Sequence, residues 1–126
     1  MSLTISHTAK TYPKRLPYAD IAKTILGAKY DVSLVFVGAD RAQAINQATR
    51  GKSYVPNVLS FPLIDSAGEI YICPVVAKKE ASKFNLTPNG YIGYLFIHGC
   101  LHLKGLDHGP KMDRLEATYM KQFQLH

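Results

Sequence analysis

One stretch near the C-terminal end, residues 91–108, decides the fold: YIGYLFIHGCLHLKGLDH. Residues 91–104 are predicted to form a long helix whose buried faces hold Tyr91, Leu95 and residues 97–101. Gly105 follows this segment, in the position where glycine commonly ends a helix. Three of the five histidines of the chain also fall within residues 98–108. The stretch therefore predicts a core helix that also carries a polar site.

The spacing of the histidines indicates a metal site. His98 and His102 are four residues apart, so on a helix they lie on one face and can share one cation. Gly105 lets the chain turn back and bring His108 to the same point. Three imidazoles with one open position are typical of catalytic zinc sites. Cys100 is expected on the opposite side of the helix. The alternatives are two buried core histidines with His108 on the surface, or a site in which two histidines bind and water completes the set.

The same spacing is found in the zinc-protease pattern H-E-x-x-H-x-x-G-x-x-H. In those proteases the second position is the glutamate that acts as general base, whereas this chain has Gly99 there. The site is therefore expected to hold a metal ion without running the protease mechanism. A metallopeptidase is the least favoured of the functions considered.

The hydrophobic patterns outside this helix predict a chain of mixed α and β structure, with strands early in the sequence and helices late. Alternating or β-branched runs predict four strands, and capping residues delimit the helices. Asp40 is expected to cap a helix, and Pro62 to end a strand. The predicted fold class is α/β (α+β), with a small, mixed, mostly parallel four-stranded sheet packed with helices and the metal-binding helix near the C-terminus. The predicted strands cover residues 3–6, 33–37, 57–61 and 69–73, and the other helices residues 18–26, 41–49, 74–84 and 110–124.

Length and composition limit the class of protein. The 126 residues suit one domain over residues 1–126. The 47% of hydrophobic residues exclude a disordered chain. No apolar run reaches the ~18 residues of a membrane helix, and we expect no signal peptide and no membrane partner. Cys73 and Cys100 make a poor disulfide framework, so free thiols and a cytoplasmic location are expected.

The charge balance is basic. Fifteen Lys and Arg against nine Asp and Glu give a formal net charge of +6. A small basic domain favours a polyanionic partner, of which nucleic acid is the usual one. A soluble basic surface without such a partner explains the charge equally well.

The histidine stretch has the form His98-Gly-x-Leu-His102-Leu-x-Gly105-x-Asp107-His108. Four shorter motifs accompany it: Asn46-Gln-Ala-Thr-Arg50-Gly-Lys52, Asn57-Val-Leu-Ser-Phe-Pro62, Gly68-Glu-Ile70 and Met112-x-x-x-Glu116. Together they resemble the YbeY-type rRNA maturation factors, a bacterial family of single-domain metal-dependent endoribonucleases. The resemblance extends from about residue 46 to 120, and the first 45 residues match only in element order. Departures from the family pattern are Thr49 for Tyr, Pro56 for Thr, Glu69 for Asp and Leu106 for an aromatic residue.

The resemblance implies a function. It implies one zinc ion held by His98, His102 and His108 at the floor of a basic cleft. It implies a single-strand endoribonuclease that matures the 3′ end of small-subunit rRNA and takes part in ribosome quality control. The implied partners are this RNA and components of the small ribosomal subunit. The oligomeric state is not implied.

Further candidate residues follow from phosphate chemistry. Arg50 is the candidate for neutralising the phosphorane, because its planar fork suits phosphate oxygens. The residues alone favour a helix-end charge or a structural ion pair for Arg50, and the resemblance to the family reverses that preference. Lys52 is expected to extend the phosphate track, and Asn57 and Ser60 to offer polar groups in the cleft. Asp107 is expected either to orient a ligating imidazole or to cap the turn before the last helix.

The mechanism stays open at two points. Either a metal-activated water attacks the phosphodiester, or the metal holds a phosphate oxygen while the RNA 2′-hydroxyl attacks. The sequence places no general base, since Glu69 and Glu116 are too distant along the chain. This gap favours an alternative function, a non-catalytic ribosome-assembly factor with a structural zinc. Six aromatic side chains are candidates for stacking on bases, although most of them are expected to fill the core instead: Tyr54, Phe61, Tyr71, Tyr91, Tyr94 and Phe96.

Overall fold

A computed structural model describes residues 2–126. Four strands form one sheet in the order β1-β2-β4-β3. The β1/β2 and β2/β4 pairs are parallel, and β3/β4 is antiparallel. The small, mixed and mostly parallel sheet predicted from the sequence is therefore confirmed. The strands are β1 (Ser2–His7), β2 (Asp31–Phe36), β3 (Val58–Ile64) and β4 (Ala67–Ile72).

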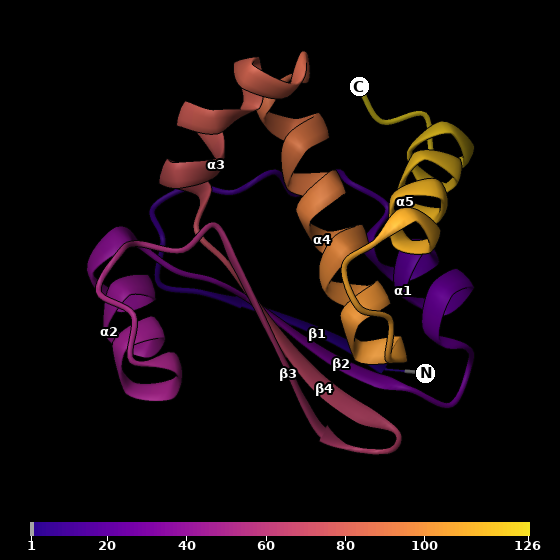
Figure 1. Cartoon of the computed structure of the whole chain (residues 1–126), viewed down its shortest axis with the longest axis horizontal. Coiled ribbons are helices and arrows are strands. Elements are labelled where there is room, and N and C mark those ends of the chain that lie inside the picture. The colour runs from indigo at the N-terminus through magenta and orange to yellow at the C-terminus, as the bar shows by residue number, and fades with distance from the viewer. Residues whose placement is uncertain (1) are drawn as a thin grey trace.

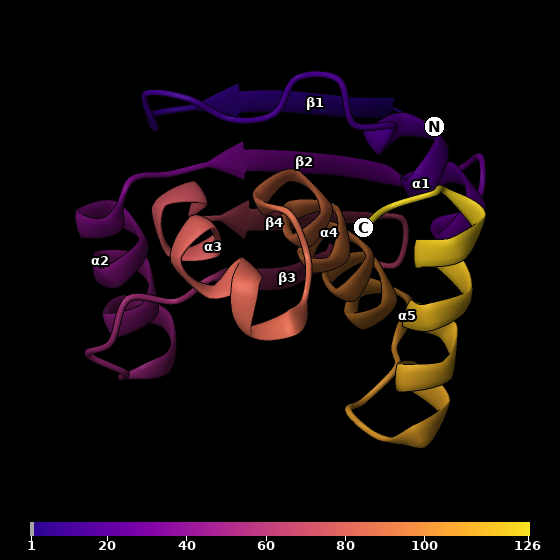
Figure 2. The same ribbon diagram turned by 90° about the horizontal axis from the view of Figure 1, so that it is seen from above.

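One helix, α4, organises the packing above the sheet (Figure 1). It contacts α1, α3, α5, β3 and β4, and α3 and α4 cross over β4 and β3 (Figure 2). The helix α2 lies apart, where β2 ends, and Ala42 on it packs in a second, smaller core with Val37 and Cys73. The helices are α1 (Tyr18–Leu26), α2 (Ala39–Arg50), α3 (Pro74–Glu80), the 3-10 helix η1 (Ala81–Phe84), α4 (Pro88–Lys104) and α5 (Pro110–Gln122).

Most predicted boundaries shift by one to three residues, the predicted helix over residues 74–84 is divided into α3 and η1, and three of the differences have a clear physical reason. The cap of α2 is Gly38, and Asp40 lies in the first turn, where a negative charge favours the helix dipole. Strand β3 continues past Pro62 to Ile64 with a register shift after Pro62, because an edge strand tolerates the missing N–H of proline. Helix α4 begins at Pro88, since Thr87 caps it by accepting a hydrogen bond from the Gly90 N–H at 3.0 Å.

The core and the thiols agree with the sequence-based expectations. Helix α4 buries Phe96, Ile97 and Leu101 almost completely. Both Cys73 and Cys100 are buried and free, and burial raises the pKa of the Cys100 thiol. Among residues 2–126, no helix is long and apolar enough to cross a membrane.

Gly99 lies where α4 approaches the sheet. A Cβ atom at this position would lie 3.0 Å from the Cδ1 and Cγ2 atoms of Ile70 on β4. The Ser60 hydroxyl on β3 donates a hydrogen bond to the Gly99 carbonyl at 3.0 Å. The position that holds the catalytic glutamate in zinc proteases is therefore filled by the sheet, which leaves no room for a long side chain.

We expect the Gly99→Ala variant to be destabilised by about 1–2 kcal/mol, because overpacking against Ile70 outweighs the gain in helix propensity. Urea unfolding of both proteins measures the difference. The added substitution Ile70→Val removes Cδ1 and should recover part of the loss. Stabilisation by Gly99→Ala alone would show that α4 and β4 are not in tight contact.

A second prediction concerns Tyr30. Within the described residues its buried hydroxyl has no hydrogen-bond partner, and such a group costs stability. We expect Tyr30→Phe to raise the free energy of unfolding by about 1 kcal/mol. The control is Tyr18→Phe, since the buried Tyr18 hydroxyl donates to the Pro13 carbonyl at 2.6 Å and its removal should destabilise. Equal losses in the two variants would contradict the prediction.

Candidate metal centre and phosphate cleft

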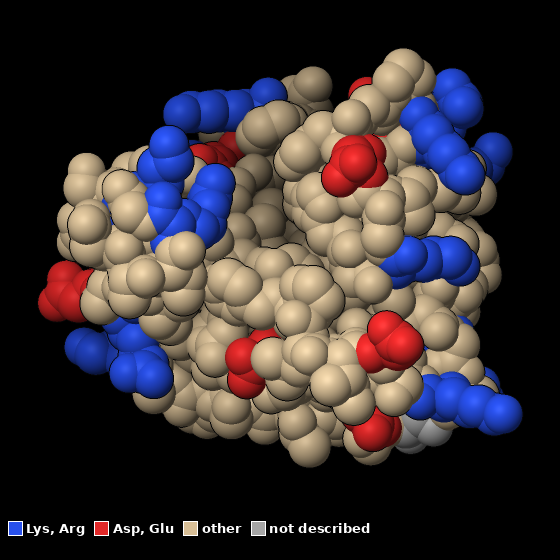
Figure 3. All heavy atoms as spheres, turned by 60° about the horizontal axis from the view of Figure 1, so that its bottom comes forward, with Lys and Arg blue, Asp and Glu red and all other residues tan. Residues whose placement is uncertain are grey.

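A cleft of about 580 Å³ opens between α4, β3 and the end of α2. The side of α4 contributes His98 and His102, and the loop after it contributes His108. Arg50 and Tyr54 line the cleft from the end of α2 and the loop that follows. Figure 3 shows this face hollowed, with Lys and Arg side chains on both sides of the hollow, at the end of the molecule that carries α2 and at the opposite end.

The three histidines converge. The Nε2 atoms of His98 and His102 lie 3.1 Å apart. The ring centroid of His108 lies 5.0 Å from that of His98 and 4.7 Å from that of His102. One ligand atom from each histidine lies within 4.8 Å of the others. Gly105 makes this possible, because its φ of 107° turns the chain back directly after α4.

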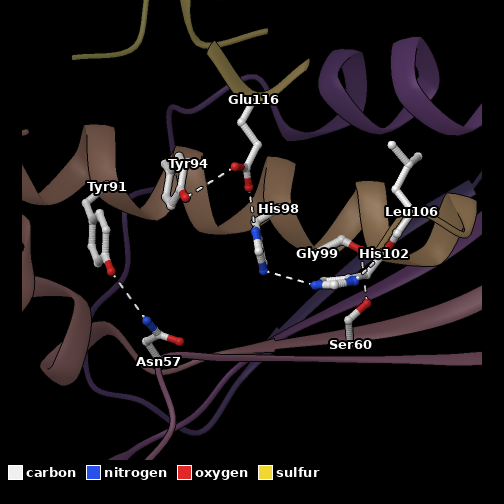
Figure 4. A network of polar contacts seen from close by, with 9 residues as sticks. All are labelled: Asn57, Ser60, Tyr91, Tyr94, His98, Gly99, His102, Leu106 and Glu116. Carbon is white, nitrogen blue, oxygen red and sulfur yellow. Dashed lines mark hydrogen bonds and ion pairs between the residues drawn. The ribbon is translucent and has the colours of Figure 1, made fainter. Parts of the chain in front are cut away.

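Hydrogen bonds set the tautomer of each helical histidine (Figure 4). The Nδ1 atom of His102 lies 3.1 Å from the Leu106 carbonyl, and because a carbonyl can only accept, Nδ1 carries the proton. The Nδ1 atom of His98 lies 2.5 Å from Oε2 of Glu116, a carboxylate that likewise accepts. When both rings are neutral, the two Nε2 atoms therefore present lone pairs to each other. Burial lowers the pKa of His102, and His98 and His108 lower it further, which favours its neutral form.

This donor set fits a metal ion. Two facing lone pairs cannot hydrogen-bond to each other, whereas a cation between them would bind both. Tetrahedral zinc with Zn–N bonds of 2.0–2.1 Å places neighbouring nitrogens about 3.3 Å apart, close to the 3.1 Å that separates the two Nε2 atoms. Imidazole ligands also suit other transition metals.

Glu116 is a site residue that the sequence alone did not place. It comes from α5, its side chain is only 6% exposed, and the Tyr94 hydroxyl donates to its Oε1 at 3.4 Å. Burial and the Glu116 carboxylate raise the pKa of Tyr94 to about 12, so this phenol remains a donor. A carboxylate behind a histidine fixes the ring and makes it a stronger ligand. The available signal was an acidic residue on the buried face of α5, one turn after Met112.

Comparison with known proteins agrees with this geometry. The family model described as Endoribonuclease YbeY matches residues 4–125. This chain belongs to the YbeY endoribonuclease family. The matched range covers β1 to α5 and therefore includes the histidines, Arg50 and Glu116.

Individual relatives of this YbeY-family chain differ in length. Endoribonuclease YbeY of Bdellovibrio bacteriovorus is 43% identical over 98 residues, which cover 76% of this chain and 63% of the relative. That of Mesoplasma florum is 33% identical and covers 98% of this chain and 85% of the relative. The chain thus spans less than two thirds of the Bdellovibrio protein. A solution structure from Thermotoga maritima superposes with a TM-score of 0.70 at 30% identity, covering 96% of this chain and 88% of that one.

The other predicted site residues lie in different environments. Arg50 lines the cleft, whereas Lys52 is exposed just beyond α2. Ser60 lines the cleft, but its hydroxyl donates to Gly99. Asp107 is exposed, and among residues 2–126 no hydrogen bond joins it to an imidazole; Leu106 and Glu116 make the contacts expected of it.

Asn57 also lines the cleft, with its polar atoms engaged inside the protein (Figure 4). Its Nδ2 donates to Glu80 at 3.0 Å and to the Tyr91 hydroxyl at 3.3 Å, and its Oδ1 accepts from the Val58 N–H. It therefore ties β3 to α3 and α4. Tyr54 is an exception to the expectation that the aromatic residues fill the core, since it is 54% exposed.

We expect Glu116→Ala to weaken zinc binding by about 10- to 100-fold, because His98 loses the carboxylate that holds its ring. Competition with a chromophoric chelator measures the affinity. Glu116→Gln, which keeps a hydrogen-bond acceptor, should lose less.

The matched control is Asp113→Asn, which removes an exposed carboxylate from the first turn of the same helix. It should bind zinc like the unmodified protein. Unchanged affinity in folded Glu116→Ala would mean that the carboxylate does not support the metal site.

Proposed function

We propose that this chain is a zinc-dependent single-strand endoribonuclease that acts in 3′-end maturation of small-subunit rRNA and in ribosome quality control. The observation that carries the proposal is one cleft that brings three imidazoles and an arginine together. The names of the relatives support the RNA-cleaving activity. In this proposal residues 1–126 act as one domain, in the cytoplasm, on the rRNA and other components of the small ribosomal subunit.

The charge of the cleft supports a polyanionic substrate. Among the described residues that line it, none is Asp or Glu. Within residues 2–126, no salt bridge joins Arg50 to a carboxylate, so its charge is not neutralised inside the protein. A guanidinium free of acidic partners is suited to bind a phosphodiester through two parallel hydrogen bonds.

Each residue has a proposed task. A zinc ion held by His98, His102 and His108 would supply a Lewis acid for phosphodiester hydrolysis. Arg50 binds a non-bridging phosphate oxygen and stabilises the charge that develops there. Glu116 holds His98 in its ligating tautomer. Lys52, Asn57 and Ser60 stay predictions as RNA-binding residues. For Asp107, which makes no hydrogen bond to an imidazole among residues 2–126, both predicted roles stay open: orienting an imidazole, or capping the turn before α5.

No general base is assigned. Glu116 is buried against His98, and Glu80 accepts hydrogen bonds from Asn57 and Tyr91. Glu69 pairs with Phe61 across β3 and β4 and does not line the cleft. The absence of an available carboxylate among the described lining residues predicts slow turnover or a need for the ribosome. It also favours the second candidate, a non-catalytic assembly factor whose zinc is structural.

The decisive test is cleavage of end-labelled single-stranded RNA by the zinc-loaded protein and by variants purified identically. We expect His102→Ala to abolish cleavage, because it removes a metal ligand. Arg50→Ala should lower kcat by about 100-fold or more, because it removes a charge that stabilises the transition state. Arg41→Ala is the matched control, since Arg41 lies on the same helix and does not line the cleft.

Three outcomes distinguish the candidates. Cleavage that needs His102 and Arg50, but not Arg41, supports the endoribonuclease. Equal cleavage by all variants indicates a contaminating nuclease. Specific rRNA binding without cleavage, together with unfolding on chelation, supports the assembly factor.

A further inference from the structure

The guanidinium of Arg50 is held by two neighbours through a single nitrogen. Its Nη1 atom donates to Oδ1 of Asn46 at 3.2 Å and to the Tyr54 hydroxyl oxygen at 3.1 Å. A guanidinium has five N–H donors, two of them on each terminal nitrogen. Both hydrogens of Nη1 are therefore engaged inside the protein, and the donors of Nη2 and Nε remain.

Asn46 is fixed in one orientation. It is fully buried, and its Nδ2 donates to the Tyr54 carbonyl at 3.0 Å, so the amide must present Oδ1 to Arg50. Asn46 and Arg50 are four residues apart on α2 and share one face. The backbone carbonyl of Asn46 also accepts from the Lys52 N–H. This buried amide thus joins the end of α2 to the loop that carries Tyr54.

Tyr54 completes the arrangement from the solvent side. Its hydroxyl oxygen accepts from Arg50, and its half-exposed ring lines the same cleft as the three histidines. An arginine has many rotamers, and ordering them costs conformational entropy. Because both hydrogens of Nη1 are engaged in the folded protein, the side chain loses this conformational entropy when the protein folds rather than when a substrate binds.

We propose that Asn46 and Tyr54 are positioning residues that fix the Arg50 guanidinium so that its Nη2–Nε edge binds the phosphodiester in the cleft. The proposal rests on the function proposed above and adds to it the residues that orient the arginine. It also gives a reason for a fully buried asparagine next to the surface loop. The two residues act through Arg50 and need not touch the RNA.

The first experiment measures the order of the guanidinium by 15N NMR of the full chain. Restricted motion of the Arg50 side chain is expected in the unmodified protein. Tyr54→Phe, which removes only an exposed acceptor, should increase this motion without unfolding the protein. Unchanged motion in Tyr54→Phe would overturn the role of the phenol.

A pair of variants isolates the contact made by Asn46. Asn46→Asp and Asn46→Leu both lose the donor to the Tyr54 carbonyl, but only the aspartate keeps an oxygen for Nη1. We expect Arg50 to be more ordered in Asn46→Asp than in Asn46→Leu. Equal order in the two folded variants would contradict the proposal. Should Asn46→Leu fail to fold, comparison of Asn46→Asp with Tyr54→Phe still decides it.

The second experiment measures cleavage of single-stranded RNA by the zinc-loaded variants. Tyr54→Phe should lower kcat about tenfold, with a smaller change in KM, because the lost order matters most where charge develops. Asn46→Leu should lose more activity, and Asn46→Asp should recover part of it.

The matched control is Gln43→Ala. Gln43 also lies on α2 and donates to the Ser53 carbonyl in the same loop at 2.6 Å, but among residues 2–126 no hydrogen bond joins it to Arg50. If the loop contacts had a structural role alone, kcat would fall equally in Gln43→Ala and Tyr54→Phe. Equal losses of kcat in these two variants would therefore overturn the proposal. Failure of the unmodified protein to cleave RNA would count against the proposed function, whereas the NMR comparison would still decide how Arg50 is held.

Discussion

The close packing of α4 on the β3/β4 hairpin is the contact on which the rest of the structure depends. Gly99 has no side chain, so the helix backbone comes near Ile70 and its carbonyl accepts from Ser60. This contact sets the height of His98 and His102 above β3 and therefore the depth of the cleft. A bulkier residue at position 99 would lift the face of α4 that carries His98 and His102 away from the wall formed by β3.

Charge is separated across the site in a consistent way. The carboxylate of Glu116 lies behind His98, on the side away from the cleft, and is nearly inaccessible to solvent. The cleft itself is lined, within residues 2–126, by imidazoles, one arginine and uncharged side chains. A negative group can thus strengthen a metal ligand without repelling an anionic substrate. The same distribution leaves no carboxylate among the described lining residues that could act as a general base.

Short-range patterns in the sequence made much of the fold and of the histidine cluster predictable. The spacing of His98 and His102 and the glycine at 105 act over a few residues, so the sequence predicted the convergence with His108. The resemblance to the YbeY family, confirmed over residues 4–125, added Arg50. The start of α4 was missed because Asn89 and Gly90 looked like a helix boundary, whereas Thr87 makes the cap.

Long-range contacts were not predictable from the sequence. Glu116 reaches His98 only because α5 folds back along α4, and nothing near residue 116 indicates its partner. Asn46 was part of a family motif in the sequence, but its contact with the loop that carries Tyr54 depends on how that loop folds over α2. Pro62 was read as a strand end because proline lacks an N–H, and only its place in an edge strand removes that penalty.

The histidines have a consequence for the order of assembly. All three lie within residues 98–108, so they can meet as soon as one helix and the turn after it have formed, and short loops close at low entropic cost. Arg50 reaches the same cleft only after the sheet has joined distant parts of the chain, which is a slower event. If the three histidines hold zinc as proposed, a refolding chain would take up the ion before the cleft is complete. Metal content of a preparation would then measure how many chains have formed this local unit, and not how many have formed the complete cleft.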